Sequence, residues 1–174
     1  MIIQHTDINV AKTMIDSDLM KKAQAIANKA RKSISKFCSE ECNAYCCRKG
    51  YLVLTKKEMS KTTQGKQIEL EKKQILKMLS NGSYSLFMGG TNEPCPALKE
   101  FKCIIHKSKN RSNACRNFPI FIDGGYIKLS PRCLAVKHGL MYPYIKQWIS
   151  LGFKILESDI YADIELSNLE IFKK

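Results

Sequence analysis

The sequence predicts a small α+β domain that is rich in helix and has short strands. Apolar residues recur every three or four positions over residues 18–37, which is typical of an amphipathic helix. Two short apolar runs, 120–122 and 126–129, flank a turn sequence at 123–125 and predict a β-hairpin. With 174 residues, of which 44% are hydrophobic, the chain can build one core but not two well-grown domains.

Helix is predicted to continue towards the first cysteines. Either the first helix or a second one is expected to run through residues 38–47, because Arg48, Lys49 and Gly50 resemble the cations and glycine of a helix C-terminus. Residues 51–54 then predict a short strand, since they are apolar and follow a glycine.

The middle of the chain predicts a bent helical insertion. Thr55 and Glu58 have the spacing of a capping box, and residues 66–79 have helical periodicity ahead of the stop signal Asn81-Gly82. Strands are expected at 83–88 and 101–106, and helices at 134–150 and 154–161.

We expect these elements to form one domain in three parts. A helix within residues 1–37 packs on the domain, residues 38–133 carry the cysteines, and helices in 134–174 complete the same domain. Residues 1–10 alternate apolar and polar side chains without the apolar stretch of an export signal. Because no apolar run approaches the ~20 residues that cross a bilayer, we expect a cytoplasmic protein without membrane contact.

The chain is strongly basic, with 29 Lys and Arg against 16 Asp and Glu, a formal charge of +13. Such a charge attracts acidic proteins and polyanions, so it leaves open a protein partner or substrate and, with weaker support, a nucleic acid. Lysines are spread over the whole chain and outnumber arginines, which favours a solvated surface over specific phosphate recognition. Sequence signatures of serine hydrolases, zinc proteases, P-loop enzymes and dinucleotide-binding domains are missing from the sequence.

Four cysteines form the pattern Cys38-x3-Cys42-x3-Cys46-Cys47. On a helix, at about 100° per residue, the first three would lie along one face. Cys47 would point about 100° away from Cys46, so the adjacent pair does not fit one closed four-ligand site unless the helix breaks. A second metal, or an unwound turn before Gly50, would resolve this conflict.

The other four cysteines follow at long spacings, at Cys95, Cys103, Cys115 and Cys133. Each has turn or loop residues beside it, and metal ligands commonly sit on such turns, where backbone amides can donate hydrogen bonds to sulfur. Their spacings are too long for a local chelating loop, so the sulfurs can meet only through folding.

Eight cysteines in a reducing compartment predict metal ligands, against the alternatives of free buried thiols and disulfides. Eight thiolates suit two four-cysteine sites, or one cluster and a separate zinc. An iron–sulfur cluster, in particular [4Fe–4S], is favoured over Zn²⁺ because all the ligands are sulfur and two are adjacent, although zinc also accepts four thiolates.

The residues around the cysteines form a longer pattern, which comprises Cys38, Cys42, Cys46 and Cys47; Leu54, Thr55 and Glu58; Cys95, Pro96 and Leu98; Cys103, Ile105 and His106; Arg111, Cys115, Arg116, Phe118 and Pro119; and Cys133. This pattern resembles the CxxCxxCC or YkgJ-type cysteine-cluster family, a proposed zinc- or iron-chelating domain. The resemblance covers residues 38–133, is most specific at 114–119, and implies that all eight cysteines bind metal. The flagellin lysine N-methylases look like distant relatives, which raises an enzymatic alternative.

The chain departs from the family pattern at three places. Its first cysteines are separated by three residues where the family usually has two, Ser112 replaces a proline and His106 replaces a tyrosine. His106 could complete a cysteine–histidine zinc site, but we expect a partly buried side chain instead. His138, five residues after Cys133, is a weaker candidate of the same kind.

Arg116, and with it Arg111, is the candidate for binding the cofactor, because a guanidinium beside an anionic cluster stabilises it. The alternative for Arg116 is a salt bridge to Glu93 or Glu100. Three functions fit the sequence: a metal-binding module with a redox, sensing or structural role, a lysine N-methyltransferase-like enzyme, and a zinc-bound basic adaptor for RNA or a ribosome.

Overall fold

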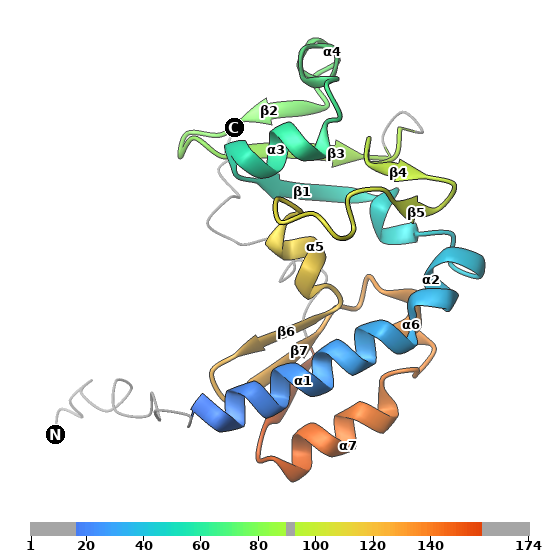
Figure 1. The fold of residues 1–174 in the computed structure, drawn as a ribbon, viewed down its shortest axis with the longest axis vertical. Coiled ribbons are helices and arrows are strands. Elements are labelled where there is room, and N and C mark those ends of the chain that lie inside the picture. Colours follow the sequence, from blue (N-terminus) through green and yellow to red (C-terminus); the bar gives the residue numbers. More distant parts are fainter. Residues whose placement is uncertain (1–16, 90–92, 158–174) are drawn as a thin grey trace, which may run out of the picture.

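The computed structural model describes residues 17–89 and 93–157, and it confirms a small α+β fold (Figure 1). The elements form two halves, each with its own sheet and hydrophobic core. The cysteine-bearing segments lie between the halves. None of the helices in the described ranges is both long and apolar enough to span a membrane.

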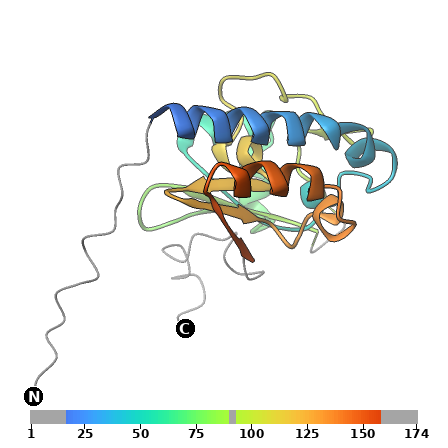
Figure 2. The same cartoon turned by 90° about the horizontal axis from the view of Figure 1, so that it is seen from below.

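One half combines the first helix with the C-terminal elements. Helix α1 (Ser17–Ser33) runs beside α7 (Tyr142–Ser150), as Figure 2 shows. Their sheet contains β6 (Ile120–Asp123), β7 (Tyr126–Leu129) and β8 (Lys154–Glu157), and α6 (Leu134–Lys137) precedes α7. The helices approach closely because α1 presents buried alanines to its neighbours. The buried Trp148 indole donates a hydrogen bond of 3.1 Å to the Ala23 carbonyl, which fixes α7 on α1.

The other half is built on the antiparallel sheet β1-β3-β2. Its strands are β1 (Gly50–Leu54), β2 (Leu76–Met78) and β3 (Tyr84–Met88), and it also contains helices α3 (Lys56–Thr62) and α4 (Gln67–Lys72). Alternate residues face the core, so Leu52 and Leu76 both stand opposite the buried Leu86. A two-residue pair of strands, β4 (Leu98–Lys99) and β5 (Lys102–Cys103), lies against this half.

Three short helices connect the halves: α2 (Ser35–Glu40), the 3₁₀ helix η1 (Tyr45–Cys47) and α5 (Asn113–Asn117). The predicted helix through residues 38–47 is therefore wrong beyond Glu40. Asn43 and Ala44 adopt left-handed backbone angles, with φ of 49° and 51°, which break the helix before η1 begins. The expectation that Cys38, Cys42 and Cys46 share one helical face is wrong for the same reason.

Local signals predicted several elements well. The strand at 51–54, the strand at 83–88 and the hairpin at 120–129 are confirmed. The capping box is also present: the Thr55 hydroxyl accepts from the Glu58 amide, and the Glu58 carboxylate accepts from the Thr55 amide. Of the strand predicted at 101–106, only Lys102–Cys103 forms.

The helix predicted over 66–79 ends early, at Lys72. Gln74 has a φ of 56°, which stops the helix, and the chain continues as β2. Asn81-Gly82 therefore turns a hairpin between β2 and β3 instead of ending a helix, and the Asn81 side chain accepts a 3.0 Å hydrogen bond from the Ser83 amide.

The C-terminal helices were predicted less accurately. Residues 134–150 form two helices, α6 and α7, because Gly139 has a φ of 74° and ends the first. Residues 154–157 are the parallel strand β8, with Ile155 opposite Ile127 of β7, where a helix was expected. The remaining residues of that predicted helix, 158–161, lie outside the described residues.

Gly89 tests how tightly the end of β3 is packed. A Cβ at this position would lie 2.4 Å from the Arg48 carbonyl oxygen, and the φ of 95° adds strain. Gly82, with a φ of 78° and open space around it, is the matched control. We expect Gly82→Ala to cost about 1–2 kcal/mol of unfolding free energy, the left-handed penalty alone. Gly89→Ala should cost more, and equal losses in denaturant unfolding would contradict the close approach.

Candidate metal centre

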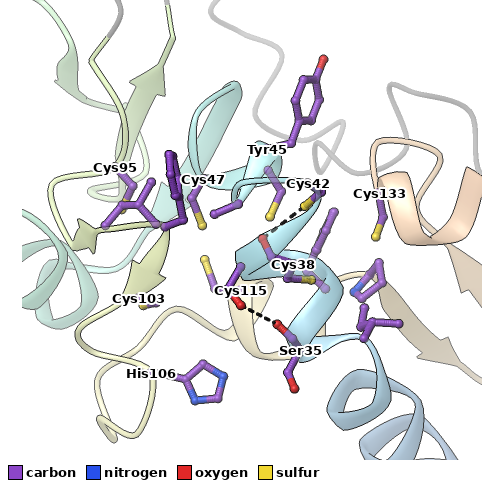
Figure 3. Close-up of a pocket in the computed structure, with 18 of the residues that line it drawn as sticks. Ser35, Cys38, Cys42, Tyr45, Cys47, Cys95, Cys103, His106, Cys115 and Cys133 are labelled. Carbon is purple, nitrogen blue, oxygen red and sulfur yellow. Dashed lines mark hydrogen bonds between the residues drawn. The ribbon is translucent and has the colours of Figure 1, made fainter. Parts of the chain in front are cut away.

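All eight cysteines line one cavity of about 600 Å³ between the two halves. Figure 3 labels all of them except Cys46. The cysteines reach the cavity from three parts of the chain, residues 38–47, 95–115 and 133. Cys95 and Cys133 are buried and the other six are partly buried, and none forms a disulfide. Folding therefore brings together every cysteine that the sequence predicted as a ligand, although metal binding by each one stays a prediction.

The first cysteines are placed by the broken helix. Cys38 lies on α2, Cys42 follows in the turn, and Cys46 and Cys47 lie on η1. The turn is held by the Cys42 amide, which donates to the Phe37 carbonyl at 2.9 Å, and by the Cys42 thiol, which donates to the Cys38 carbonyl at 3.4 Å. These bonds direct Cys38 and Cys42 to the same region of the cavity.

A backbone contact joins the two cysteine groups. The Cys95 amide donates a 2.8 Å hydrogen bond to the Cys47 carbonyl, although 47 and 95 are far apart in sequence. The Leu98 amide donates to the Cys95 carbonyl, and Leu98 is paired with Cys103 across β4 and β5. This chain of contacts places Cys47, Cys95 and Cys103 near one another.

Cys115 lies on the short helix α5, which differs from the turn expected for it. Glu58 holds the start of this helix: one oxygen of its carboxylate completes the capping box of α3, and the other accepts from the Asn113 amide at 2.9 Å. Cys133 lies immediately before α6, so its surroundings match the predicted turn more closely. Glu58 is thus a positioning residue that the sequence indicated only as a cap.

The sulfurs are gathered but not closed around an ion. Within residues 17–89 and 93–157, no three histidine, cysteine, aspartate or glutamate side chains stand in an arrangement that could hold a metal ion as they are. The donor set itself is suited to soft metals, because thiols dominate the cavity and only one carboxylate, Glu40, lines it. Metal binding would therefore require the cysteine-bearing segments to move closer together.

Burial opposes thiolate formation at most of these cysteines. It raises the pKa of the Cys38 and Cys115 thiols to about 12, and that of the Cys95 and Cys133 thiols to about 11. Neighbouring thiols add to the effect, because each thiolate repels the next. A group of buried thiols held in this way needs a cation to make the charged form favourable.

Cys46 differs from its neighbours. A hydrogen bond from the Cys47 thiol, together with the positive charges of Arg132 and Arg111, lowers the pKa of Cys46 to about 7 despite its burial. The same hydrogen bond, with burial, raises the pKa of Cys47. The adjacent pair is therefore electrostatically unequal, and its first member is the more anionic.

The arginines near the thiols differ in role from one another. Arg116, the first candidate for cofactor binding, lines the cavity but donates to the carbonyls of Ser108, Lys109 and Arg111, so it braces the loop before α5. The alternative salt bridge from Arg116 to Glu93 or Glu100 is not among its described contacts.

Arg111 is the better placed of the two candidates. It donates to the Cys115 carbonyl at 3.0 Å, and its Nε is buried without a hydrogen-bond partner among the described residues. An unpaired guanidinium N–H beside thiols is a donor suited to a thiolate or sulfide. Arg132, which the sequence reasoning missed, also contributes charge at Cys46 and donates to the Lys49 carbonyl at 3.0 Å. The sequence feature that could have indicated this role is the position of Arg132 directly before Cys133.

Neither histidine candidate gains support as a ligand. His106 lines the cavity but is exposed, so the expected partial burial is wrong. Burial and the nearby charge of Arg111 lower its pKa. His138 is exposed, and its ring contacts that of Phe37 at a tilt of 57°, with ring centroids 5.6 Å apart.

A search with protein-family models matched residues 37–134 to the CxxCxxCC family, described as "Putative zinc- or iron-chelating domain". The match spans more than half of the chain and contains all eight cysteines. The chain belongs to the CxxCxxCC family. Searches of curated proteins and of solved structures found no significant match.

Membership in the CxxCxxCC family indicates that the thiols of this cavity chelate metal. Chelation of zinc or iron needs several thiolates in one place, and the segment matched to the family delivers every cysteine to the cavity. Thr55 and Glu58 of the predicted pattern have a physical role, since together they cap α3 and Glu58 also holds the start of α5, which carries Cys115.

The variants Glu58→Ala and Thr55→Ala distinguish the capping of α3 from the support of α5. Both variants lose the cap of α3, which costs about 1–2 kcal/mol. Only Glu58→Ala also releases the Asn113 amide and thus α5. We expect Glu58→Ala to hold metal more weakly than Thr55→Ala when both are challenged with a chelator. Equal metal retention would show that Glu58 does not position Cys115.

Proposed function

We propose that this chain is an iron–sulfur protein that binds [4Fe–4S] clusters through its cysteine thiolates and serves a redox or redox-sensing role. The observation that carries the proposal is the meeting of eight unpaired thiols at one cavity that has almost no oxygen ligands. Iron–sulfur clusters are held by cysteine thiolates, and they supply one-electron chemistry when bound.

The charge of the cavity supports an anionic cofactor. Six cationic side chains line it against the single acid Glu40: Arg31, Lys36, Lys102, Arg111, Arg116 and Arg132. A four-iron cluster with four thiolates carries about −2 in its common oxidised state, so nearby cations stabilise it and raise its reduction potential. The unpaired Nε–H of Arg111 is suited to donate to a cluster or ligand sulfur.

The size of the cavity also favours a cluster over single ions. Zinc holds thiolate sulfur at about 2.3 Å, so four sulfurs around it stand only ~3.8 Å apart. The sulfurs here share one cavity of about 600 Å³, and within the described residues no three of them are arranged to hold a single ion as they stand. A cluster with its own inorganic sulfide fills more of this volume with less movement of the chain.

Anaerobic purification separates iron–sulfur from zinc. We expect a brown protein with iron and acid-labile sulfide in equal amounts and a broad visible absorption that bleaches with dithionite. A colourless protein with about two zinc ions per chain would contradict the proposal and support the zinc-bound adaptor. A metal-free folded monomer with eight titratable thiols would remove metal binding altogether.

Metal removal should lower the stability of the fold. The ligands come from segments far apart in the sequence, so a bound metal ties these segments together and adds its binding energy to folding. We expect chelation under reducing conditions to lower the melting temperature by about 10 °C or more, since ~4 kcal/mol corresponds to shifts of this size. Melting that is unchanged by chelation would place the metal outside the folded site.

A further inference from the structure

We infer that the eight cysteines form two separate four-thiol metal sites, and that the adjacent Cys46 and Cys47 divide between them. The first site comprises Cys38, Cys42, Cys46 and Cys133, and the second comprises Cys47, Cys95, Cys103 and Cys115. The inference rests on the proposed function in taking the thiols as metal ligands, and it assigns which thiols share a metal.

Backbone contacts define the second site. The hydrogen bond from the Cys95 amide to the Cys47 carbonyl joins two of its members directly. Cys103 is placed beside them through Leu98, which bonds to Cys95 and pairs with Cys103. Figure 3 shows Cys47, Cys95, Cys103 and Cys115 towards one end of the cavity.

The two hydrophobic cores divide the thiols in the same way. Cys95, Cys47, Cys103 and Cys115 all pack on the core of the β1-β3-β2 half. Cys38 and Cys133 pack on the other core, with α1 and α7. Extensive contacts between the described helices and strands lie within one half or the other. Each core thus supports its own group of sulfurs.

The first site is completed by Cys42 and Cys46. Cys42 is held to Cys38 by the contact between its thiol and the Cys38 carbonyl, and Figure 3 shows Cys38, Cys42 and Cys133 on the opposite side from Cys95. Cys46 and Cys47 are consecutive on the 3₁₀ helix and their thiols are hydrogen-bonded to each other, so this pair lies where the two groups of sulfurs meet. Because Cys47 is anchored to Cys95, Cys46 is the member free to join the first site.

Serine variants of the full chain test the division. Cys42→Ser and Cys103→Ser form a matched pair, since both thiols are partly buried and belong to different sites. After anaerobic reconstitution with ferrous iron and sulfide, each should retain roughly half of the wild-type iron. Cys38→Ser/Cys42→Ser should lose no more iron than Cys42→Ser alone, whereas Cys42→Ser/Cys103→Ser should lose nearly all of it.

A measurement on the wild-type chain avoids variants that fail to fold. The metal-loaded protein is titrated with a chelator and pulse-alkylated, and each cysteine is quantified by mass spectrometry. We expect two groups of four to become reactive, with Cys46 and Cys47 in different groups. Simultaneous exposure of all eight, or exposure of Cys46 and Cys47 together in one group, would overturn the division.

The same experiments distinguish this inference from the proposed function. Zinc in place of iron, with two groups of four in the alkylation pattern, would refute the iron–sulfur proposal but support the division. Iron and sulfide bound as one cluster, lost completely in either single variant, would support the proposed function and overturn the division.

Discussion

The two hydrophobic cores of this protein do not merge, and the thiol-lined cavity occupies the space where they would meet. Apolar burial stabilises each half separately, with Trp148 and the alanines of α1 in one core and the leucines of the β1-β3-β2 sheet in the other. Polar contacts and short connecting helices join the halves: Arg132 donates a hydrogen bond to the Lys49 carbonyl, and the Glu58 carboxylate accepts one from the Asn113 amide of α5.

The arrangement of charge follows from that constraint. Buried thiols are costly to ionise, and the raised pKa of Cys38, Cys95 and Cys115 expresses this cost. Cationic side chains around the cavity offset this cost of ionisation. Part of the strongly positive net charge of the chain is therefore placed near the thiols. A basic composition alone suggested nucleic acid or an acidic partner, whereas the structure places several of the cations beside sulfur.

The sequence predicted best where the determining signal is local. The capping box at Thr55 and the hairpin turn at 123–125 are set by neighbouring residues, and both formed as expected. Residues 154–157 were assigned to a helix because a short Lys-Ile-Leu-Glu run has no distinctive period, and only the edge of β7 makes it a strand. The grouping of the cysteines is decided by long-range contacts, such as the one between Cys95 and Cys47, that no local pattern contains.

The bond between Cys95 and Cys47 also closes a long excursion of the chain. The chain turns away from the first cysteines after Cys47 and returns at Cys95, one hydrogen bond from where it left, and the Gly89 backbone packs against Arg48 beside this point. The strands of this excursion share their core with Cys95, Ala97 and Ile105, so the sheet anchors the segment that carries the later sulfurs. Glu58 provides a second anchor, because it holds the start of α5 and with it Cys115.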